Sequence, residues 1–374
     1  MLTFHSLRVA EIRPDAEDAV AISLDVPAEL REVYRGLPGQ HVVVRTRVND
    51  TENRRTYSLV SAPGESPLRI VARVHPQGRM SRYLAEQLNA GDHLDILPPN
   101  GSFTPRQPQS AGSYVAFAAG CGITPVLAIT QALLSASPDS QVAVFYGNAH
   151  TARAMCLEEL LALKDRFLGR LSLHFVMSRE PQDVELYNGR LDAERVRLFA
   201  RTLFNPAQVR EFFVCGPGNM IEEVTGALSG LGVPAERIHG EHFTVATTAA
   251  TEGAPATVSA ERVATAGGKA PPTQERTLPP DSAEVTVLMD GRRRSFTMRM
   301  NDETVLDAAA NAGLELPFSC RAGVCSTCRT KVVRGAVEMA QNYALEEWEV
   351  EQGYVLACQS RLKTPVLELD YDEK

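Results

Sequence analysis

Four cysteines near the carboxyl end of the chain constrain its fold more than any other feature of the sequence. Cys320, Cys325 and Cys328 follow the spacing Cys-x4-Cys-x2-Cys, and Cys358 comes in a separate segment. The residues between the first three are small enough for a loop to wrap closely around a bound group: Ala322, Gly323, Ser326 and Thr327. The pattern predicts a compact loop whose thiolates hold a metal cluster, with backbone amides directed at the sulfurs.

Two other uses of cysteine fit this pattern less well. Zinc sites more often combine two Cys-x2-Cys pairs, whereas this segment has one pair at that spacing. Disulfides imply an oxidising compartment, but the chain has an odd number of cysteines, 7, and its first residues lack the apolar core of a signal peptide. The remaining cysteines, Cys121, Cys156 and Cys215, are expected to be buried small hydrophobic residues by default.

Composition and charge limit the class of protein and its partners. The chain has 374 residues, enough for two or three domains, with the 44% hydrophobic and 22% charged content of an ordinary soluble protein. Its net charge of -8 argues against nucleic acid or an anionic membrane as a main partner. The most apolar run, residues 114–129, is interrupted by Gly120, Gly122 and Pro125 and is a poor membrane span. We therefore expect a cytoplasmic protein that binds neither nucleic acid nor a membrane.

Changes in hydrophobic periodicity predict three domains and a linker. Residues 1–108 form short strands with Gly and Pro turns and one helix, which is typical of an antiparallel β-barrel. Residues 109–244 alternate strands with helices, as in the doubly wound parallel sheet of an α/β domain. Residues 245–283 are rich in Ala, Thr, Gly and Pro without periodicity, which indicates a flexible linker rather than a structured long loop. Residues 284–374 regain a pattern and predict a small α+β domain around the cysteine loop.

The predicted barrel contains residues suited to a phosphate and a flat ring. Because strand side chains alternate, Arg55 and Tyr57 lie on one face. Arg55 can neutralise a phosphate, and Tyr57 can lie against a ring. Gly78 lets the backbone approach a pyrophosphate, and Ser81, near the start of the next helix, can bind it. Taken alone, these residues also fit a solvated strand edge and a core aromatic side chain.

The predicted α/β domain has two glycine turns, each between a strand and a helix. Residues 120–125 form the first, and residues 214–220 the second. Glycine allows close approach of a ligand, and a helix N-terminus favours phosphate. The turns lie at the carboxyl ends of parallel strands and therefore bracket a crevice in which a dinucleotide can lie. Neither turn has the full Gly-x-Gly-x-x-Gly fingerprint, so plain strand–helix turns are the alternative.

Together these motifs resemble two known families. The turns and the Arg55–Ser58 segment are similar to the ferredoxin–NADP reductase superfamily, and the cysteine loop resembles plant-type [2Fe–2S] ferredoxins, which have the β-grasp fold. The domain order resembles that of reductase components of bacterial multicomponent oxygenases. Short motifs are similar to those of the reductase subunits of phenylacetyl-CoA epoxidases: Phe4–Leu7, Pro38–His41, Tyr146–Asn148, Glu241–Phe243 and Ala357–Gln359.

The resemblance implies a role for each matching residue. The residues that bind FAD through its phosphates and ring are Arg55, Thr56, Tyr57, Ser58, Gly78, Met80 and Ser81. The residues that line the nicotinamide nucleotide crevice are Gly120, Gly122, Thr124, Pro125, Gly216, Pro217, Gly218 and Met220. The catalytic residues beside the flavin and nicotinamide are Cys215, Glu241 and Phe243. The cluster ligands are Cys320, Cys325, Cys328 and Cys358. On physical grounds alone the flavin residues fit FAD and FMN equally.

One strand end bears on the choice between NADPH and NADH. Ser178 and Arg179 resemble the pair that binds the 2′-phosphate in NADP-dependent relatives, and Arg supplies a bidentate fork for that group. Glu180 is the one acidic residue there that suits a ribose 2′-hydroxyl. A surface Ser-Arg turn, which some NADH-dependent relatives carry, is the alternative. We expect NADPH.

The resemblance implies an electron-transfer reductase rather than an enzyme with its own acid–base chemistry. Electrons pass from NADPH to FAD, to the [2Fe–2S] cluster and to a di-iron oxygenase, in the first place phenylacetyl-CoA 1,2-epoxidase of phenylacetate catabolism. Another aromatic-ring oxygenase is an alternative partner. A stand-alone oxidoreductase acting on a quinone or ferric chelate, and a redox sensor without turnover, are alternative functions.

Two surface features relate to the transfer of electrons to a partner. The linker is expected to tether the cluster domain at high effective concentration. Acidic residues near the carboxyl end either steer docking to a basic partner or form a solvated surface: Glu346, Glu347, Glu349, Glu351, Asp370, Asp372 and Glu373.

Overall fold

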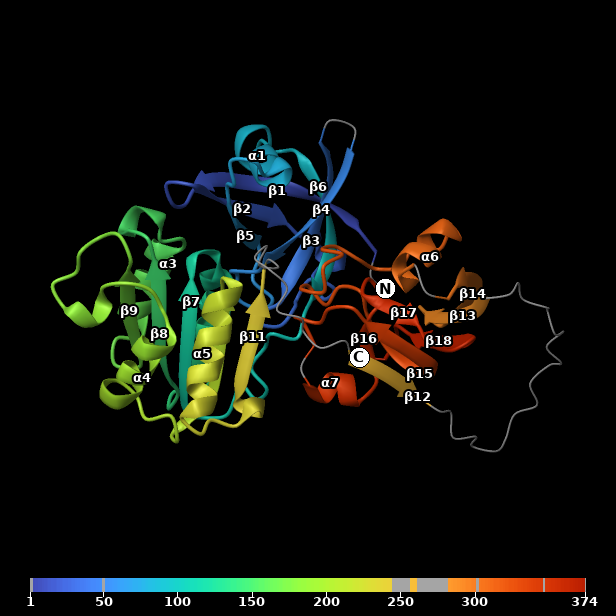
Figure 1. The fold of residues 1–374 in the computed structure, drawn as a ribbon. Coiled ribbons are helices and arrows are strands. Elements are labelled where there is room, and N and C mark those ends of the chain that lie inside the picture. Colours follow the sequence, from blue (N-terminus) through green and yellow to red (C-terminus); the bar gives the residue numbers. More distant parts are fainter. Residues whose placement is uncertain are drawn as a thin grey trace. The chain divides into compact units, whose positions relative to one another are not determined.

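The computed structural model describes residues 3–48, 51–243, 256–260, 282–300, 303–345 and 347–373. The chain forms two compact units, Leu2–Ala246 and Thr247–Lys374 (Figure 1). The amino-terminal unit contains two sheets, and the carboxy-terminal unit contains one. Within the described residues no helix combines the length and the apolar character needed to cross a membrane.

The first sheet is antiparallel and closes into a barrel. Its strands run in the order β4-β3-β6-β1-β2-β5. Their bounds are β1 His5–Pro14, β2 Ala19–Asp25, β3 His41–Val48, β4 Thr51–Ser58, β5 Leu68–Arg73 and β6 His93–Asn100, with a short 3-10 turn at Ala28–Leu30 and helix α1 at Arg79–Glu86. An antiparallel bridge between Leu59 and Ile70 joins the ends of the two edge strands. Alternating residues such as Leu7, Val9 and Ile22 fill the barrel core, as the sequence pattern predicts.

The second sheet is parallel and covered by helices on both faces. Its order is β11-β10-β7-β8-β9, seen in green and yellow in Figure 1. The bounds are β7 Ser113–Ala119, α2 Ile123–Ala136, β8 Gln141–Asn148, α3 Leu157–Arg166, β9 Leu171–Met177, α4 Ala193–Thr202, β10 Val209–Gly216, α5 Gly218–Gly230 and β11 Ile238–His242. Helices α2 and α3 pack against one face of the sheet, and α4 and α5 against the other. This is the predicted doubly wound architecture.

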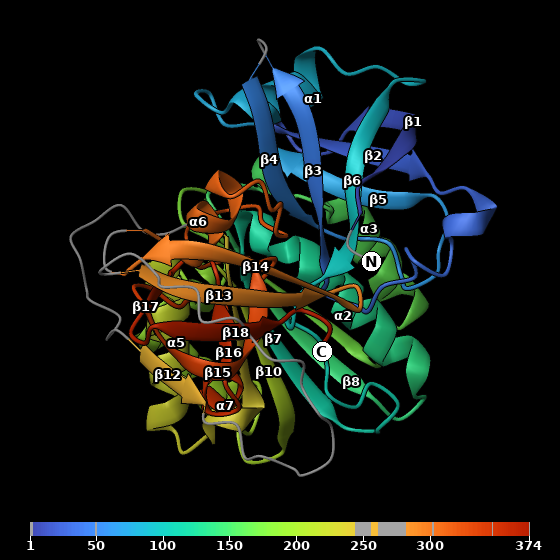
Figure 2. The same cartoon turned by 90° about the vertical axis from the view of Figure 1, so that its right-hand side faces the viewer.

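The carboxy-terminal unit is a mixed sheet with short helices. The strand order is β12-β15-β18-β13-β14, which Figure 2 shows, and β16 and β17 also pair with β15. The bounds are β12 Ala256–Ala260, β13 Ser282–Met289, β14 Arg292–Arg299, α6 Val305–Asn311, β15 Arg329–Met339, α7 Glu347–Glu351, β16 Tyr354–Leu356, β17 Ser360–Leu362 and β18 Val366–Asp370. Asp290 and Gly291 have φ of 55° and 68°, as expected for the tight turn of the predicted β13–β14 hairpin.

Three strands are absent from the sequence-based prediction: β11, β12 and the short β17. β11, Ile238–His242, is the fifth strand of the parallel sheet, and its sequence is short and largely polar. β12, Ala256–Ala260, lies inside the predicted linker and pairs with β15. The remainder of the 245–283 linker, up to residue 281, lies outside the described residues, so its predicted character stays a prediction.

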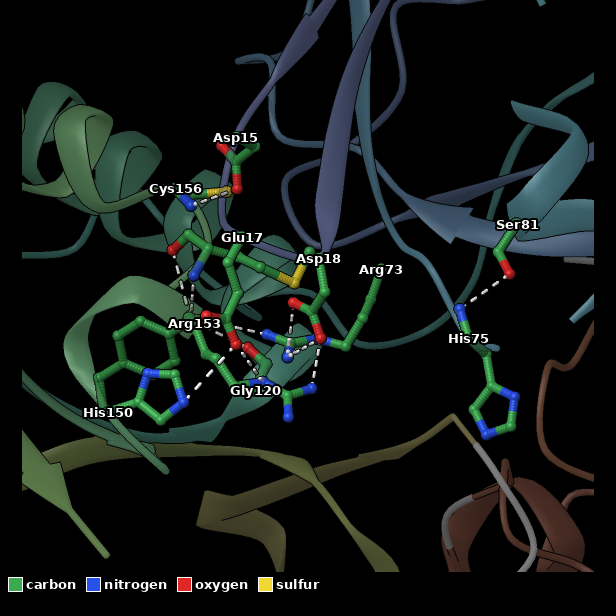
Figure 3. A network of polar contacts seen from close by, with 12 residues as sticks. Asp15, Glu17, Asp18, Arg73, His75, Ser81, Gly120, His150, Arg153 and Cys156 are labelled. Carbon is green, nitrogen blue, oxygen red and sulfur yellow. Dashed lines mark hydrogen bonds and ion pairs between the residues drawn. The ribbon is translucent and has the colours of Figure 1, made fainter. Parts of the chain in front are cut away.

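Charged side chains join the barrel to the parallel sheet, as Figure 3 shows. Asp18, in the β1–β2 turn, lies 3.1 Å from Arg73 and also pairs with Arg153, which precedes α3. Glu17 lies 3.7 Å from Arg153 and 3.6 Å from His150. The backbone N–H of Glu17 donates to the carbonyl of Ala152 at 2.9 Å. These contacts connect a turn of the barrel to the loop that follows β8, so they help to hold the two sheets as one unit.

Replacing Asp18 with Asn should destabilise this unit. The side chain is 23% exposed and faces two arginines, so losing its charge should lower the free energy of unfolding by about 1–2 kcal/mol. Urea denaturation measures the change. Asp25→Asn is the matched control, because Asp25 is 49% exposed and pairs with a single exposed arginine, Arg8; its effect should stay within about 0.5 kcal/mol. Equal effects of both substitutions would contradict this role of Asp18.

Candidate functional site

Three polar side chains lie side by side at one end of the barrel. In the antiparallel register, His41 of β3 is opposite Ser58 of β4 and opposite Asn100 of β6. Residues that face each other across antiparallel strands share a face of the sheet. Ser58 Oγ, His41 Nε2 and Asn100 Oδ1 are buried without a hydrogen-bond partner among the described residues.

A carboxylate from the parallel sheet faces the same row. Glu241, near the end of β11, has Oε1 at 3.7 Å from His41 Nδ1, while its Oε2 is buried without a partner in the described structure. Burial raises the pKa of the Glu241 carboxyl, and the nearby His41 partly opposes this. Four unpaired polar atoms from two sheets therefore meet in one place. Buried polar atoms of this kind are normally hydrogen bonded, so the arrangement fits a bound group that carries both donors and acceptors, such as a flavin ring.

Cys215 lies beside Glu241. The two residues are partners in the parallel register of β10 and β11. Burial first, and the charges of Glu241 and Cys121 next, raise the pKa of the Cys215 thiol well above its usual value. Cys215 is therefore a neutral thiol rather than a reactive thiolate. It can present a polarisable surface next to a bound ring without acting as a nucleophile.

The residues of β4 that are predicted to bind the flavin differ in the solvent exposure of their side chains. Arg55 is exposed, and its neighbours Thr56 and Tyr57 are half-buried. Burial raises the pKa of Tyr57, opposed by the charge of Arg55, so the hydroxyl stays protonated. Arg55 thus presents an exposed cation on β4, whereas the Tyr57 ring packs against the barrel core.

At helix α1 the predicted residues act through the backbone and the turn. Ser81 Oγ accepts the N–H of His75 at 3.1 Å, a hydrogen bond drawn in Figure 3. The same Oγ lies 3.4 Å from the carbonyl oxygen of Gly78. A Cβ at Gly78 would lie 2.4 Å from Ser81 Oγ, so glycine is required there. Met80 is buried in the barrel core. The side chains of Met80 and Ser81 thus shape the turn, and their backbone N–H groups face outward from the first turn of the helix.

The two glycine turns of the parallel sheet lie against each other. A Cβ at Gly122 would lie 2.0 Å from the carbonyl oxygen of Cys215, which explains the need for glycine. Helices α2 and α5 begin directly after these turns, and among the described residues neither has a side chain that caps its first N–H groups. β7 and β10 are neighbours in the sheet, so two uncapped helix N-termini stand together at their carboxyl ends. This pair of positive helix ends suits the phosphates of a dinucleotide.

The other residues predicted to line this crevice contact their own turns or the core of the domain. Thr124 Oγ1 donates to the carbonyl of Cys121 at 2.9 Å, so its hydroxyl closes its own turn. Met220 is buried, and a Cβ at Gly216 would lie 2.8 Å from its Cε. Phe243 is half-buried and packs against the core beneath α2. Pro125, Pro217 and Gly218 lie in the first residues of α2 and α5 or directly before them.

The acidic residue near the predicted 2′-phosphate site is already engaged. Glu180 accepts the backbone N–H of Thr151 at 2.6 Å and the Thr151 hydroxyl at 2.7 Å. These hydrogen bonds lower the pKa of Glu180. Ser178 lies against Asn148, with its Oγ 3.3 Å from the Asn148 carbonyl, while the Arg179 side chain is exposed. Glu180 therefore belongs to the loop, and Arg179 remains available to an anion.

The four predicted cluster ligands converge in the carboxy-terminal unit. Hydrogen bonding from the thiols of Cys325 and Cys358 lowers the pKa of Cys320, and Cys358 also interacts with Cys328. Backbone and side-chain donors point at the sulfurs. Ala322 N lies 3.3 Å from Cys320 Sγ, Cys320 N lies 3.5 Å from Cys325 Sγ, and Gln359 Nε2 lies 3.5 Å from Cys358 Sγ. Donors directed at thiolate sulfur are what a [2Fe–2S] cluster requires.

Three residues of the cysteine loop have left-handed backbone conformations. Arg321, Gly323 and Ser326 have φ of 55°, 74° and 47°, in the left-handed region. In the described part of the chain, no three His, Cys, Asp or Glu side chains surround a site for a single metal ion. A two-iron cluster takes two thiolates per iron, so it does not need such a group of three. The thiol set and its donors fit the cluster.

Part of the acidic set near the carboxyl end has a structural role. Glu349 is buried and pairs with Arg329 at 2.8 Å. Asp372 accepts the N–H groups of Asp290 and Gly291 at 2.7 and 2.8 Å. Neither carboxylate is available to a docking partner. The side chains of Glu346 and Glu347 lie outside the described residues.

Three family models match successive parts of the chain. Residues 7–104 match an oxidoreductase FAD-binding domain, residues 117–226 an oxidoreductase NAD-binding domain, and residues 287–363 a 2Fe-2S iron-sulfur cluster binding domain. Each matched range lies within one of the domains expected from the sequence. The boundaries at residues 108, 244 and 283 stay predictions.

Curated relatives match over the whole chain. The chain is 38% identical to a subunit of the 1,2-phenylacetyl-CoA epoxidase of Escherichia coli K12, over 100% of this chain and 99% of the relative. It is 30% identical to the ferredoxin reductase component of 3-ketosteroid-9-alpha-monooxygenase of Rhodococcus rhodochrous, over 98% and 96%. The chain belongs to the oxygenase reductase family. It is an NAD(P)H-dependent oxidoreductase that carries FAD-binding, NAD-binding and [2Fe–2S] domains.

Solved structures share the fold of this reductase. A phthalate dioxygenase reductase covers 98% of each chain with a TM-score of 0.55 and 22% identity. An intact type IV self-sufficient cytochrome P450 monooxygenase covers 98% of this chain and 41% of that chain, with a TM-score of 0.69 and 21% identity. These likenesses confirm the fold class: an antiparallel flavin domain, a doubly wound nucleotide domain and a ferredoxin domain.

The candidate residues predicted from sequence omit two members of the polar row. His41 appears there only within a resembling motif, and Asn100 does not appear at all. A local signal exists for both, because His41 begins β3 two residues after Gly39 and Asn100 ends β6 directly before Gly101. Gly101 has φ of 121°, and a Cβ there would lie 3.0 Å from His41 Nδ1. Glycine at this position makes room for the His41 ring.

The raised pKa of Glu241 predicts a pH dependence of stability. Because the folded state holds the Glu241 proton more tightly than the unfolded state, this group stabilises the fold fully below the usual pKa of 4.5. That stability is lost as pH rises from there through the raised pKa. Glu241→Gln removes the titration, so the variant should gain stability relative to wild type with rising pH, by about 1.4 kcal/mol per unit of raised pKa.

Urea denaturation at a series of pH values above 4.5 tests this expectation. Glu236→Gln, at an exposed position just before β11, is the control and should leave the pH profile of wild type unchanged. Parallel profiles for wild type and Glu241→Gln would mean that the buried carboxyl does not titrate as described.

Proposed function

We propose that this reductase passes electrons from NADPH to a di-iron oxygenase that acts on phenylacetyl-CoA. The single observation that carries the proposal is the end-to-end match, at 38% identity, with the 1,2-phenylacetyl-CoA epoxidase component from Escherichia coli. The match includes the flavin, nucleotide and cluster domains together, so it concerns the whole electron path rather than one module. When bound, FAD accepts a hydride from the nicotinamide and the [2Fe–2S] cluster takes the electrons singly.

The residues of the chain have the task of binding and orienting the two cofactors. Arg55 neutralises a flavin phosphate, and Tyr57 lies against the flavin. Ser58, His41 and Asn100 supply polar atoms to one edge of the ring. Because this row and Glu241 come from two different sheets, residues of both the barrel and the parallel sheet would hold the ring.

On the nucleotide side, the paired N-termini of α2 and α5 bind the pyrophosphate, and the neutral thiol of Cys215 borders the nicotinamide. Phe243 excludes water from the crevice with its half-buried ring. No side chain is required to act as a nucleophile or as a general base. The four cysteines Cys320, Cys325, Cys328 and Cys358 hold the cluster.

NADPH is the preferred donor in this proposal. Arg179 is exposed at the end of β9, whereas both oxygens of Glu180 are taken by Thr151. A ribose 2′-phosphate gains a cation there, and a ribose 2′-hydroxyl gains no free carboxylate. We also place the protein in the cytoplasm, a reducing compartment in which cluster thiols are kept from forming disulfides.

Arg179→Ala tests the preference for NADPH. The KM for NADPH should rise about tenfold or more, as expected when a charge-assisted hydrogen bond worth about 1.5–3 kcal/mol is lost. The KM for NADH should not change. Steady-state rates of dye reduction with each nucleotide measure both values. Arg201→Ala, an exposed arginine on α4, is the control. Equal changes for both nucleotides would count against a 2′-phosphate site.

Reconstitution tests the function as a whole. The anaerobically purified chain, the oxygenase components of a phenylacetyl-CoA epoxidase, NADPH and phenylacetyl-CoA should together yield an oxygenated thioester. Cys325→Ser should abolish product and cluster reduction, yet leave NADPH-dependent flavin reduction at the wild-type rate. Cys156→Ala, which removes a buried thiol from the other unit, should retain product formation.

Two outcomes would contradict the proposal in different ways. Product from a simple aromatic compound but none from the CoA thioester would exclude the proposed substrate class and leave the electron path intact. Loss of flavin reduction in Cys325→Ser would contradict the separation of the flavin and cluster modules.

A further inference from the structure

Tyr371 lies next to the cysteine loop although it is close to the end of the chain. β18 pairs with β15 in an antiparallel register that sets Leu369 opposite Val332 and Asp370 opposite Lys331. Continued by one residue, this register places Tyr371 opposite Thr330. Thr330 Oγ1 donates to the carbonyl of Asp370 at 2.9 Å, so the two segments are still joined at this point.

The same register brings Tyr371 near a cluster ligand. Cys328 stands in the turn directly before β15, two residues from Thr330. Aromatic side chains reach diagonal neighbours as well as the residue directly opposite. Tyr371 also packs against the core that contains Cys328 and Cys358.

The hydroxyl group of Tyr371 is enclosed and unpaired. The residue as a whole is half-buried, but its hydroxyl oxygen is buried and has no hydrogen-bond partner among the described residues. Burial raises the pKa of Tyr371 well above its usual value, and the next contributions come from Cys328 and Cys358. The hydroxyl therefore keeps its proton and lies within electrostatic reach of both thiols. Leaving a buried donor without an acceptor is unfavourable, so an acceptor is expected at this place.

We propose that the Tyr371 hydroxyl donates a hydrogen bond to the sulfur side of the [2Fe–2S] cluster held by Cys328 and Cys358, and thereby raises its reduction potential. The inference rests on the proposed ligand set. It adds a residue that sets the driving force of electron transfer without binding iron, flavin or nucleotide. Tyr371 is thus a positioning residue, because it acts through the cluster sulfurs.

The direction of the effect follows from charge. Reduction adds one negative charge to the cluster, and a donor directed at its sulfur stabilises the reduced form more than the oxidised form. Gln359 and the backbone of Ala322 already supply N–H donors to Cys358 and Cys320. Tyr371 adds an O–H donor beside Cys328, the ligand directly before β15.

Tyr371→Phe in the full-length holoprotein tests the proposal. The variant should keep the wild-type ratio of iron to protein, and the midpoint potential of its cluster should fall in a redox titration followed by EPR. We expect up to about a tenfold change in the equilibrium constant for cluster reduction, which is about 59 mV for a one-electron couple. Tyr371→His, which retains a donor, should return the potential toward the wild-type value. Thr286→Val, which removes a hydroxyl from neighbouring β13, should leave it unchanged.

Several other outcomes would overturn the inference. A Tyr371→Phe variant with full iron content and an unchanged or higher potential would mean that the hydroxyl does not reach the cluster. Iron loss in both the Phe and His variants would make Tyr371 a structural residue. If only the Phe variant loses iron, the potential of the His variant decides. A wild-type potential in the His variant supports the proposal, and a shifted potential overturns it. A cluster signal retained in Cys325→Ser would instead reject the ligand set, whatever the behaviour of Tyr371.

Discussion

Buried polar atoms need hydrogen-bond partners, and the flavin region of this reductase is organised around four that have none within the described chain. Ser58, His41 and Asn100 come from three neighbouring barrel strands, and Glu241 comes from the last strand of the parallel sheet. Leaving such atoms unpaired is costly, so this region suits a bound polar group that supplies the missing donors and acceptors. The contact of His41 with Glu241 requires both sheets, and the Asp18–Arg153 pair helps to keep them together. The polar row and Glu241 therefore stay together only while the two sheets keep their contact.

Local features of the site could be predicted from the sequence because each depends on residues that are close together in the chain. In the cysteine loop, the residues with positive φ angles and the small residues all lie within a few positions of the cysteines. The cysteine spacing is therefore enough to predict such a loop. The glycine turns are also local, because Gly122 is needed for the contact with the Cys215 carbonyl and each turn leads directly into a helix. The same holds for the domain classes, which follow from periodicity.

Features that depend on tertiary contacts could not be predicted in this way. The meeting of His41 with Glu241 joins residues 200 positions apart (241 − 41), and nothing in either segment points to the other. Glu349 stands in an acidic run that is typical of a surface, yet its side chain is buried and pairs with Arg329. Resemblance assigns Ser81 and Thr124 to ligands, whereas their hydroxyls contact the turns that contain them. In each case the contacts of the side chain depend on its burial, and burial cannot be obtained from the sequence alone.

Strand β12 alters the expected connection between the two units. Ala256–Ala260 pairs with β15 and so belongs to the carboxy-terminal sheet, and β13 of the same sheet starts at Ser282. The segment from 261 to 281 therefore begins and ends within one unit, and the connection between the units runs only from Phe243 to Ala256. Even a fully extended chain of that length spans no more than about 45 Å. The tether therefore limits how far electrons can be carried from the flavin-bearing unit to this span plus the size of the carboxy-terminal unit itself.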